Sequence, residues 1–305
     1  MAGTGEAGRT VVGVDGSAGA RAALTWALAD AARRGNRLEV LSAFPVQPIL
    51  ADPFLLDEQQ LEAVRTDTLA RVRALVDEVV AEAGTEGVEI DVLAVAGPSA
   101  PMLLAAAEDA DLMVVGSRGR GAVASLLLGS VALGCVTHAR VPVVVVHPAA
   151  EPGAGPARVV VGLDGSPESG AALERAAREA QQRGAEVVAV AAWSGISYWS
   201  EAYEVMLPPV DQLAADVREG AEEQVAAADL PDGVPVRVEC VEGRAGDVLV
   251  EAARGAELLV VGGHGQGAVR GVLLGSVALH CVLSGPCPVM VVPGAEDAGR
   301  HAAEG

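Results

Sequence analysis

The chain has 305 residues, a length that suggests two domains of about 150 residues each. Apolar residues make up 51% of the chain and aromatic residues 2%, so we expect an aliphatic core and exclude a disordered chain. The formal net charge is −20 and all 21 basic residues are arginines, which excludes a nucleic-acid partner because no basic stripe offsets the repulsion. The absence of lysine excludes a Walker P-loop, a protein-kinase site and a pyridoxal Schiff base.

Strands and helices are predicted to alternate along the first half of the chain. Ser17 stands where a helix N-cap is expected and Gly35 where the same helix ends. The alternation predicts an α/β fold with a doubly wound, five-stranded parallel sheet of flavodoxin-like or Rossmann-like order. The predicted strands are residues 10–15, 37–44, 89–96, 112–116 and 141–147, and the predicted helices are 18–34, 57–82, 99–108 and 130–139.

The second half of the chain repeats the first, which predicts two such sheets in tandem, related by a pseudo-two-fold axis. Ser166 and Gly184 take the places of the first helix caps. The repeated segments are VVGVDGS (11–17) and VVGLDGS (160–166), LMVVGSRG (112–119) and LLVVGGHG (258–265), LLGSVAL (127–133 and 273–279), and VPVVVV (141–146) and CPVMVV (287–292).

The repeat also sets the expected domain boundaries. We predict one domain at residues 1–148 and a second at 158–293. The stretch 149–157 is rich in Pro, Gly and Ala, so we expect a linker there, and we expect a disordered tail at 294–305.

A glycine-rich loop follows the fourth predicted strand of each half. Its spacing is Gly116-x2-Gly119-x9-Gly129-Ser130 in the first half and Gly262-x2-Gly265-x9-Gly275-Ser276 in the second. We expect left-handed torsions at these glycines to turn backbone N–H groups toward a phosphate, and the missing side chains to let it approach. The serine then begins a helix whose free N–H groups and dipole favour an anion. A single loop of this kind is explained equally well by turn glycines, but the repeated spacing favours phosphate binding.

The predicted topology brings these loops to one place. Ligands of open α/β sheets bind beyond the carboxyl ends of the strands, where the strand order reverses, here between the first and fourth strands. Asp15 and Asp164 follow the first strand of each half. A dinucleotide fingerprint also matches loosely, but it belongs after the first strand with an acidic residue about 20 positions on, and neither condition is met.

These motifs together resemble the universal stress protein family in its tandem-domain form, over nearly the whole chain. The family's Gly-x2-Gly-x9-Gly-Ser/Thr nucleotide motif is present in both halves, and VVGVDGS and VPVVVV also look like the family. The lysine-free, Ala-, Arg- and Gly-rich composition resembles that of an actinobacterial protein. The resemblance implies a stress-response or regulatory protein that binds ATP, with the presence of Mg²⁺ left open.

The resemblance also implies a role for individual residues. It places Asp15 and Asp164 by the adenosine and the loops and serines on the phosphates. Arg118 would neutralise phosphate charge, and His264 only when protonated; an exposed loop side chain is an equally good explanation of both. The implied nucleotide-binding residues are Gly13, Asp15, Ala43, Gly116, Arg118, Gly119, Gly129, Ser130 and Val131 in the first half, and Gly162, Asp164, Ala192, Gly262, His264, Gly265, Gly275, Ser276 and Val277 in the second.

The family pairs its fifth strands across a dimer, so we expect these strands to pair within this chain as an intramolecular pseudo-dimer, with a homodimer of the whole chain left open. Pro142 and Pro288 fit edge strands because proline cannot donate to a ladder. No signal peptide or membrane span is expected, since the uncharged stretch 121–137 is shorter than a membrane helix. We therefore expect a cytoplasmic protein with reduced cysteines.

Two classes of function remain, a nucleotide-binding regulator and a slow Mg-dependent ATPase. Hydrolysis needs a residue that orients water and a cation clamp on the γ-phosphate. At the matching variable position the loops carry Arg118 and His264, whose chemistry is not equivalent. We therefore expect regulation, with no catalytic residues and no metal site of protein ligands. A flavin or electron-transfer domain has only fold-level analogy behind it.

Overall fold

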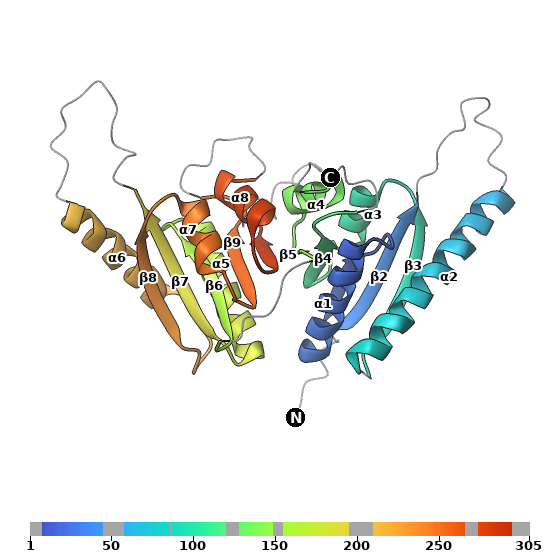
Figure 1. Cartoon of the computed structure of the whole chain (residues 1–305), viewed down its shortest axis with the longest axis horizontal. Coiled ribbons are helices and arrows are strands. Elements are labelled where there is room, and N and C mark those ends of the chain that lie inside the picture. Colours follow the sequence, from blue (N-terminus) through green and yellow to red (C-terminus); the bar gives the residue numbers. More distant parts are fainter. Residues whose placement is uncertain are drawn as a thin grey trace, which may run out of the picture. The chain divides into compact units, whose positions relative to one another are not determined.

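The structure is a computed structural model, and it describes residues 8–44, 58–85, 87–119, 128–148, 155–194, 210–265 and 274–294. The chain divides into two compact units, Met1–Pro148 and Ala149–Gly305 (Figure 1). Each unit alternates strands and helices, so the predicted α/β class is confirmed. Most of the predicted linker and all but the first residue of the predicted tail lie outside the described residues.

The sheet of the first unit is parallel throughout, with the strand order β3-β2-β1-β4-β5. The order reverses between β1 and β4, as predicted, so the loops after these two strands emerge side by side. The elements are β1 (Arg9–Gly13), α1 (Ala18–Arg34), β2 (Arg37–Phe44), α2 (Glu58–Ala83), β3 (Ile90–Ala96), α3 (Ser99–Ala106), β4 (Leu112–Gly116), α4 (Ser130–His138) and β5 (Val143–Val146).

The second unit repeats this arrangement, with the parallel order β8-β7-β6-β9-β10. Its reversal falls between β6 and β9, the counterparts of β1 and β4. The elements are β6 (Arg158–Leu163), α5 (Pro167–Arg183), β7 (Glu186–Trp193), α6 (Val210–Ala227), β8 (Val236–Glu242), α7 (Ala245–Ala252), β9 (Leu258–Gly262), α8 (Ser276–Ser284) and β10 (Val289–Val292).

The first helix of each unit has the caps that the sequence predicts. The Ser17 hydroxyl accepts the backbone N–H of Ala20 at 3.1 Å, and Gly35 ends α1 with φ of 69°. Ser166 caps α5 in the same way, and Gly184 ends it with φ of 62°. These caps set where the chain turns after β1 and β6, and therefore which residues face the carboxyl edge of each sheet.

The core of each unit is aliphatic and centres on its middle strands. Right-handed crossovers put the first two helices of a unit on one face of its sheet and the last two on the other, and α1 contacts α2 while α3 contacts α4 (Figure 1). Val11, Val12 and Val114 are completely buried between these layers. The outer strands are less covered, since Leu93 in β3 and Val241 in β8 remain exposed.

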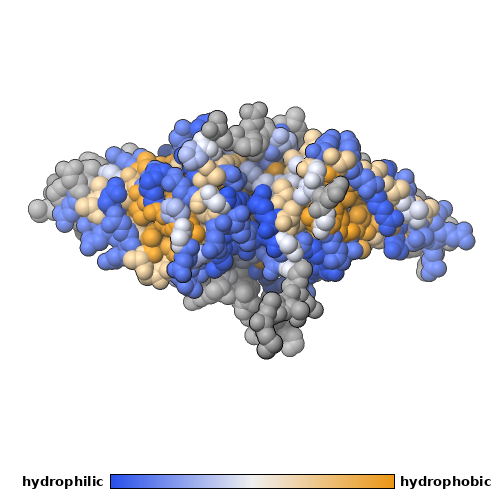
Figure 2. Space-filling view, turned by 90° about the horizontal axis from the view of Figure 1, so that it is seen from below, coloured by the Kyte–Doolittle hydropathy of each residue, from blue (hydrophilic) through white to orange (hydrophobic). Residues whose placement is uncertain are grey.

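Figure 2 shows a patch of apolar residues on each unit, bordered by hydrophilic residues. Among the described residues, no helix combines the length and the apolar character that crossing a bilayer requires.

Candidate functional site

A cavity of about 260 Å³ opens at the strand reversal of the first unit. The turn after β1, the loop after β4 and the start of α4 form its walls. All the residues that the resemblance implied for this half line it: Gly13, Asp15, Ala43, Gly116, Arg118, Gly119, Gly129, Ser130 and Val131.

The second unit has a cavity of about 380 Å³ in the corresponding place. The residues implied for this half also line one cavity: Gly162, Asp164, Ala192, Gly262, His264, Gly265, Gly275, Ser276 and Val277. Residues far apart in the sequence therefore meet twice, in the same relative positions.

Backbone hydrogen bonds bring the two ends of each glycine-rich loop together. Ser117 donates its N–H to Val146 at 2.8 Å, and its carbonyl accepts the N–H of Gly129, also at 2.8 Å. In the second unit Gly263 takes the place of Ser117, donating to Val292 at 2.8 Å and accepting from Gly275 at 2.7 Å. The last glycine therefore lies against the first part of the loop, although residues 120–127 and 266–273 lie outside the described part of the chain.

The left-handed torsions expected at the loop glycines are absent from the described residues. The glycines with positive φ in the described residues do not include Gly116, Gly119, Gly129 or their counterparts. Gly116, Gly119 and their counterparts Gly262 and Gly265 need glycine for space instead, whereas Gly129 has room for a Cβ. A Cβ on Gly116 would lie 2.5 Å from the backbone of Gly19, so any side chain there would push α1 away from β4. The positive φ occurs in the turn after the first strand, at Gly16 (80°) and Gly165 (78°).

The helices α4 and α8 begin at the cavities without a side-chain cap. Ser130 and Ser276 are their first residues, as predicted, and the N-cap positions are Gly129 and Gly275, which provide no side-chain hydrogen bond. In contrast, Ser17 caps α1 close by. The first-turn N–H groups of α4 and α8 are therefore left for a ligand, and the helix dipole adds partial positive charge.

Asp15 and Asp164 join the turn after the first strand to the glycine-rich loop. Oδ1 of Asp15 accepts the N–H of Ser17 at 2.9 Å, and Oδ1 of Asp164 accepts the N–H of Ser166 at 3.0 Å. The other oxygen, Oδ2, lies close to Gly119 or Gly265. Each carboxylate therefore holds the turn and also borders the cavity.

Among the described lining residues, the two cavities differ in the basic side chain at one matching position. Arg118 is exposed, and its carbonyl accepts the Ser17 hydroxyl at 3.3 Å, which holds the loop against the start of α1. His264 takes the matching position and is half-buried. The first cavity therefore has a permanent positive charge, whereas the second has an imidazole that is charged only when protonated.

Two leucines form part of the cavity walls and were not expected from the sequence. Leu103 of α3 lines the first cavity and Leu249 of α7 the second. A Cβ on Gly13 would lie 2.8 Å from Leu103 Cδ1, and a Cβ on Gly162 would lie 2.9 Å from Leu249 Cδ1. Gly13 and Gly162 therefore make room for a leucine that shapes the apolar end of each cavity. The sequence signal that could have found these two residues is a leucine in the short apolar helix before the fourth strand of each half.

The described residues of these sites include few titratable groups of the kind that bind metals. Among the described residues, no group of three or more His, Cys, Asp or Glu side chains is arranged to hold a metal ion. Cys135 and Cys281 lie in α4 and α8, where burial raises the pKa of each thiol to about 12. These thiols are core groups and remain protonated at neutral pH.

The model of the universal stress protein family matches residues 7–147 and again residues 156–293. The universal stress protein Rv1996 of Mycobacterium tuberculosis is 36% identical, in a match that covers 92% of this chain and 93% of that protein. Mycobacterium is an actinobacterial genus, so these relatives fit the actinobacterial source that the composition suggested.

Two solved structures extend the comparison. A universal stress protein from Archaeoglobus fulgidus is 22% identical, covers 94% of this chain and 99% of its own, and has a TM-score of 0.67, which shows the shared fold. A universal stress protein in complex with cAMP is 31% identical with a TM-score of 0.33, covering 45% of this chain and 97% of its own. Given the family match in both halves, the chain belongs to the universal stress protein family, as a tandem of two domains.

Proposed function

We propose that each domain binds one molecule of ATP and that occupancy of the two sites changes the conformation or the partners of a cytoplasmic stress-response regulator. The observation that carries this proposal is the same in both domains. A glycine-rich loop and a helix N-terminus without a side-chain cap border one cavity, together with a carboxylate from the turn after the first strand.

The lining of each cavity suits the two ends of a nucleotide. At one end, apolar groups such as Ala43 and Leu103 would pack on the adenine, and Asp15 would accept hydrogen bonds from the base or ribose. At the other end, the loop N–H groups, Ser130 and the start of α4 would hold the phosphates, and Arg118 would offset their charge. Mg²⁺, where present, would bind chiefly through the phosphates themselves.

The residues at the phosphate end support binding rather than rapid hydrolysis. Arg118 and His264 occupy matching positions but differ in charge and reach. A catalytic cation clamp on the γ-phosphate would require the same chemistry in each site that turns over ATP. We therefore infer regulation by occupancy, with slow Mg-dependent hydrolysis as the alternative.

We also infer that the fifth strands of the two domains pair within the chain. β5 and β10 are short, valine-rich and preceded by Pro142 and Pro288, as expected for strands that end a sheet. The carbonyls of these prolines accept the N–H groups of Met113 and Leu259, each at 3.0 Å, which starts each ladder correctly inside its own domain. An apolar strand of this kind needs a partner to avoid aggregation.

The experiment that tests the function starts from the purified chain. The protein is denatured and the released small molecules are separated by chromatography, while binding of added ATP is measured by calorimetry. We expect ATP among the released molecules and two binding sites per chain. A chain that neither releases ATP nor binds added ATP would refute the proposal. Steady release of phosphate over many turnovers with Mg²⁺ would instead support the ATPase.

A further inference from the structure

One side chain from α6 reaches the turn that holds Asp164. The Oε1 of Gln224 accepts the N–H of Gly165 at 3.2 Å. Its Nε2 donates to the carbonyl of Ser166 at 3.1 Å and to the hydroxyl of Ser169 at 2.8 Å. Both ends of this amide are therefore engaged with the segment that runs from β6 into α5.

The same turn continues to the candidate nucleotide site. The Ser166 hydroxyl donates to Oδ1 of Asp164 at 2.5 Å, and the Ser169 hydroxyl accepts the N–H of Asp164 at 3.4 Å. Oδ2 of Asp164 in turn lies against Gly265 in the glycine-rich loop. A continuous chain of hydrogen bonds thus runs from α6 to Asp164, whose carboxylate lies against the loop that would hold the phosphates.

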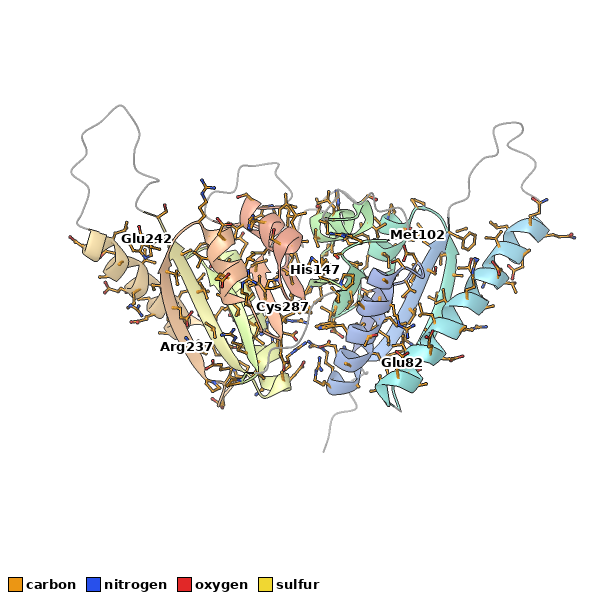
Figure 3. The ribbon with its side chains drawn as sticks, in the orientation of Figure 1. Glu82, Met102, His147, Arg237, Glu242 and Cys287 are labelled. Atoms are coloured by element: carbon orange, nitrogen blue, oxygen red, sulfur yellow. The ribbon has the colours of Figure 1, made fainter. Side chains whose placement is uncertain are left out.

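The first domain has a different arrangement at the matching positions. Glu78 of α2 lines the groove beside Asp15 and Gly16, as Gln224 lines the groove beside Asp164 and Gly165. However, Glu78 pairs with Arg21 at 3.0 Å, as Glu82 does at 2.7 Å (Figure 3 labels Glu82 on α2). All three side chains of this ion-pair cluster are at least 32% exposed.

The sequence of the first domain differs at the positions that make the amide connection. The repeat places Ala20 at the position of Ser169, and Arg21 at the position of Gly170. Ala20 has no hydroxyl to accept the amide. A Cβ on Gly170 would lie 3.6 Å from Nε2 of Gln224, whereas Arg21, at the matching position of the first domain, carries a long side chain that pairs with Glu78.

We propose that Gln224 is a positioning residue that couples α6 to occupancy of the second nucleotide site, so that α6 responds to ATP while α2 of the first domain does not. The proposal rests on the proposed ATP binding. A nucleotide that fixes Asp164 also fixes the turn to which Gln224 is bonded, and α6 is then ordered with it. Linkage requires the reverse as well, so loosening α6 lowers the ATP affinity of this site by the same coupling factor.

The test measures amide hydrogen exchange in α6 and α2 with and without ATP. It uses the full chain carrying Ser130→Glu, which we expect to remove phosphate binding from the first site alone. We expect ATP to slow exchange in α6, and Gln224→Ala to abolish that protection while weakening ATP binding several-fold. Gln182→Ala, at an exposed glutamine of α5, is the matched control and should leave both results unchanged.

A second comparison addresses the selectivity of the coupling. In the chain carrying Ser276→Glu, which leaves only the first site, ATP should not alter exchange in α2, with or without Glu78→Ala. The coupling is refuted if ATP binds but protects α6 equally with and without the Gln224→Ala substitution. It is also refuted if ATP protects α2 as strongly as α6. In both cases the proposed ATP sites would remain. If calorimetry finds no ATP bound by the unmodified chain, the proposed function fails, and the coupling with it.

Discussion

Oδ2 of Asp15 lies so close to Gly119 that a Cβ built on this glycine would be 2.6 Å from it. The contact joins the turn after β1 to the loop after β4, which are separated by about a hundred residues of sequence. Asp164 and Gly265 have the same relationship, with an even smaller separation. In both domains the loop glycine therefore determines where the carboxylate can stand at the edge of the cavity.

Replacing that glycine should displace the carboxylate. For Gly119→Ala we expect a loss of about 1–3 kcal/mol of stability, because the added methyl group overlaps a fixed side chain. ATP affinity of the first site should fall about tenfold or more, since Asp15 can no longer hold its position. Chemical denaturation and calorimetry measure the two effects.

Gly129→Ala is the control for this change within the same loop. The Cβ of this variant would meet its nearest atom, the Ser117 carbonyl oxygen, at 3.5 Å, an ordinary contact. The backbone torsions of Gly129 (φ −77°, ψ 152°) are also open to alanine. Its stability should stay close to that of the unmodified chain. A destabilisation as large as that of Gly119→Ala would show that the contact with Asp15 is not the cause.

An acidic residue at the first position of α4 or α8 should prevent ATP binding without destabilising the fold. Ser130 and Ser276 are exposed helix-starting residues, where a carboxylate stabilises the helix by about 0.3–1 kcal/mol. The same charge repels phosphate. Ser130→Glu and Ser276→Glu should each reduce the ATP stoichiometry from two to one and the double variant to zero, with no loss of thermal stability. Two sites remaining in either single variant would place the phosphates elsewhere.

Arg118 and His264 should give the two sites different affinities for ATP. Arg118→Ala removes a charged donor, so the first site should bind ATP about 10–100-fold more weakly, corresponding to about 1.5–3 kcal/mol. The loss should shrink at high salt. His264→Arg should tighten the second site at pH 8. Calorimetry in the single-site backgrounds Ser276→Glu and Ser130→Glu measures each site alone. Equal affinities before and after Arg118→Ala would mean that this side chain points to solvent in the complex.

The cysteines should differ sharply in reactivity. Burial raises the pKa of Cys135, Cys281 and Cys287 to about 12, so these thiols stay protonated at pH 8 in the folded chain (Figure 3 labels Cys287). Cys240 in β8 is only partly buried. A thiol reagent at pH 8 should therefore modify one cysteine per native chain and four after unfolding. Cys240→Ala should abolish the native reaction.

The raised thiol pKa values also predict how stability changes at high pH. The unfolded chain loses these protons near pH 9, whereas the folded chain keeps them until about pH 12. The unfolded state therefore binds fewer protons in this window, and the free energy of unfolding falls as pH rises through it. Urea titrations at pH 8 and pH 10 measure the fall, which Cys135→Ala should reduce.

Most of the fold could be read from local patterns. The bounds of α1, β2 and β4 agree with the predicted ranges because caps and glycines mark them in the sequence. The helix predicted at 99–108 ends earlier, at Ala106, because a turn follows it, and the strand predicted at 141–147 is shortened to Val143–Val146 behind Pro142. These ends depend on hydrogen bonds with neighbouring elements, which a periodic pattern does not record.

The residues that the resemblance implied line one cavity in each domain, because the strand order brings the repeated positions to one edge of the sheet, and their role in binding stays a prediction. The sequence by itself determined the tandem α/β fold, the caps of the first helices and the loop residues around each cavity. Only the tertiary structure decided why those residues are needed. Gly116 is required by the backbone of Gly19 and Gly119 by Asp15. Leu103 lines the first cavity, and Gln224 bonds the turn beside the second, through packing between distant segments. Such contacts arise when separate elements meet, so their distances cannot be inferred from spacing along the chain.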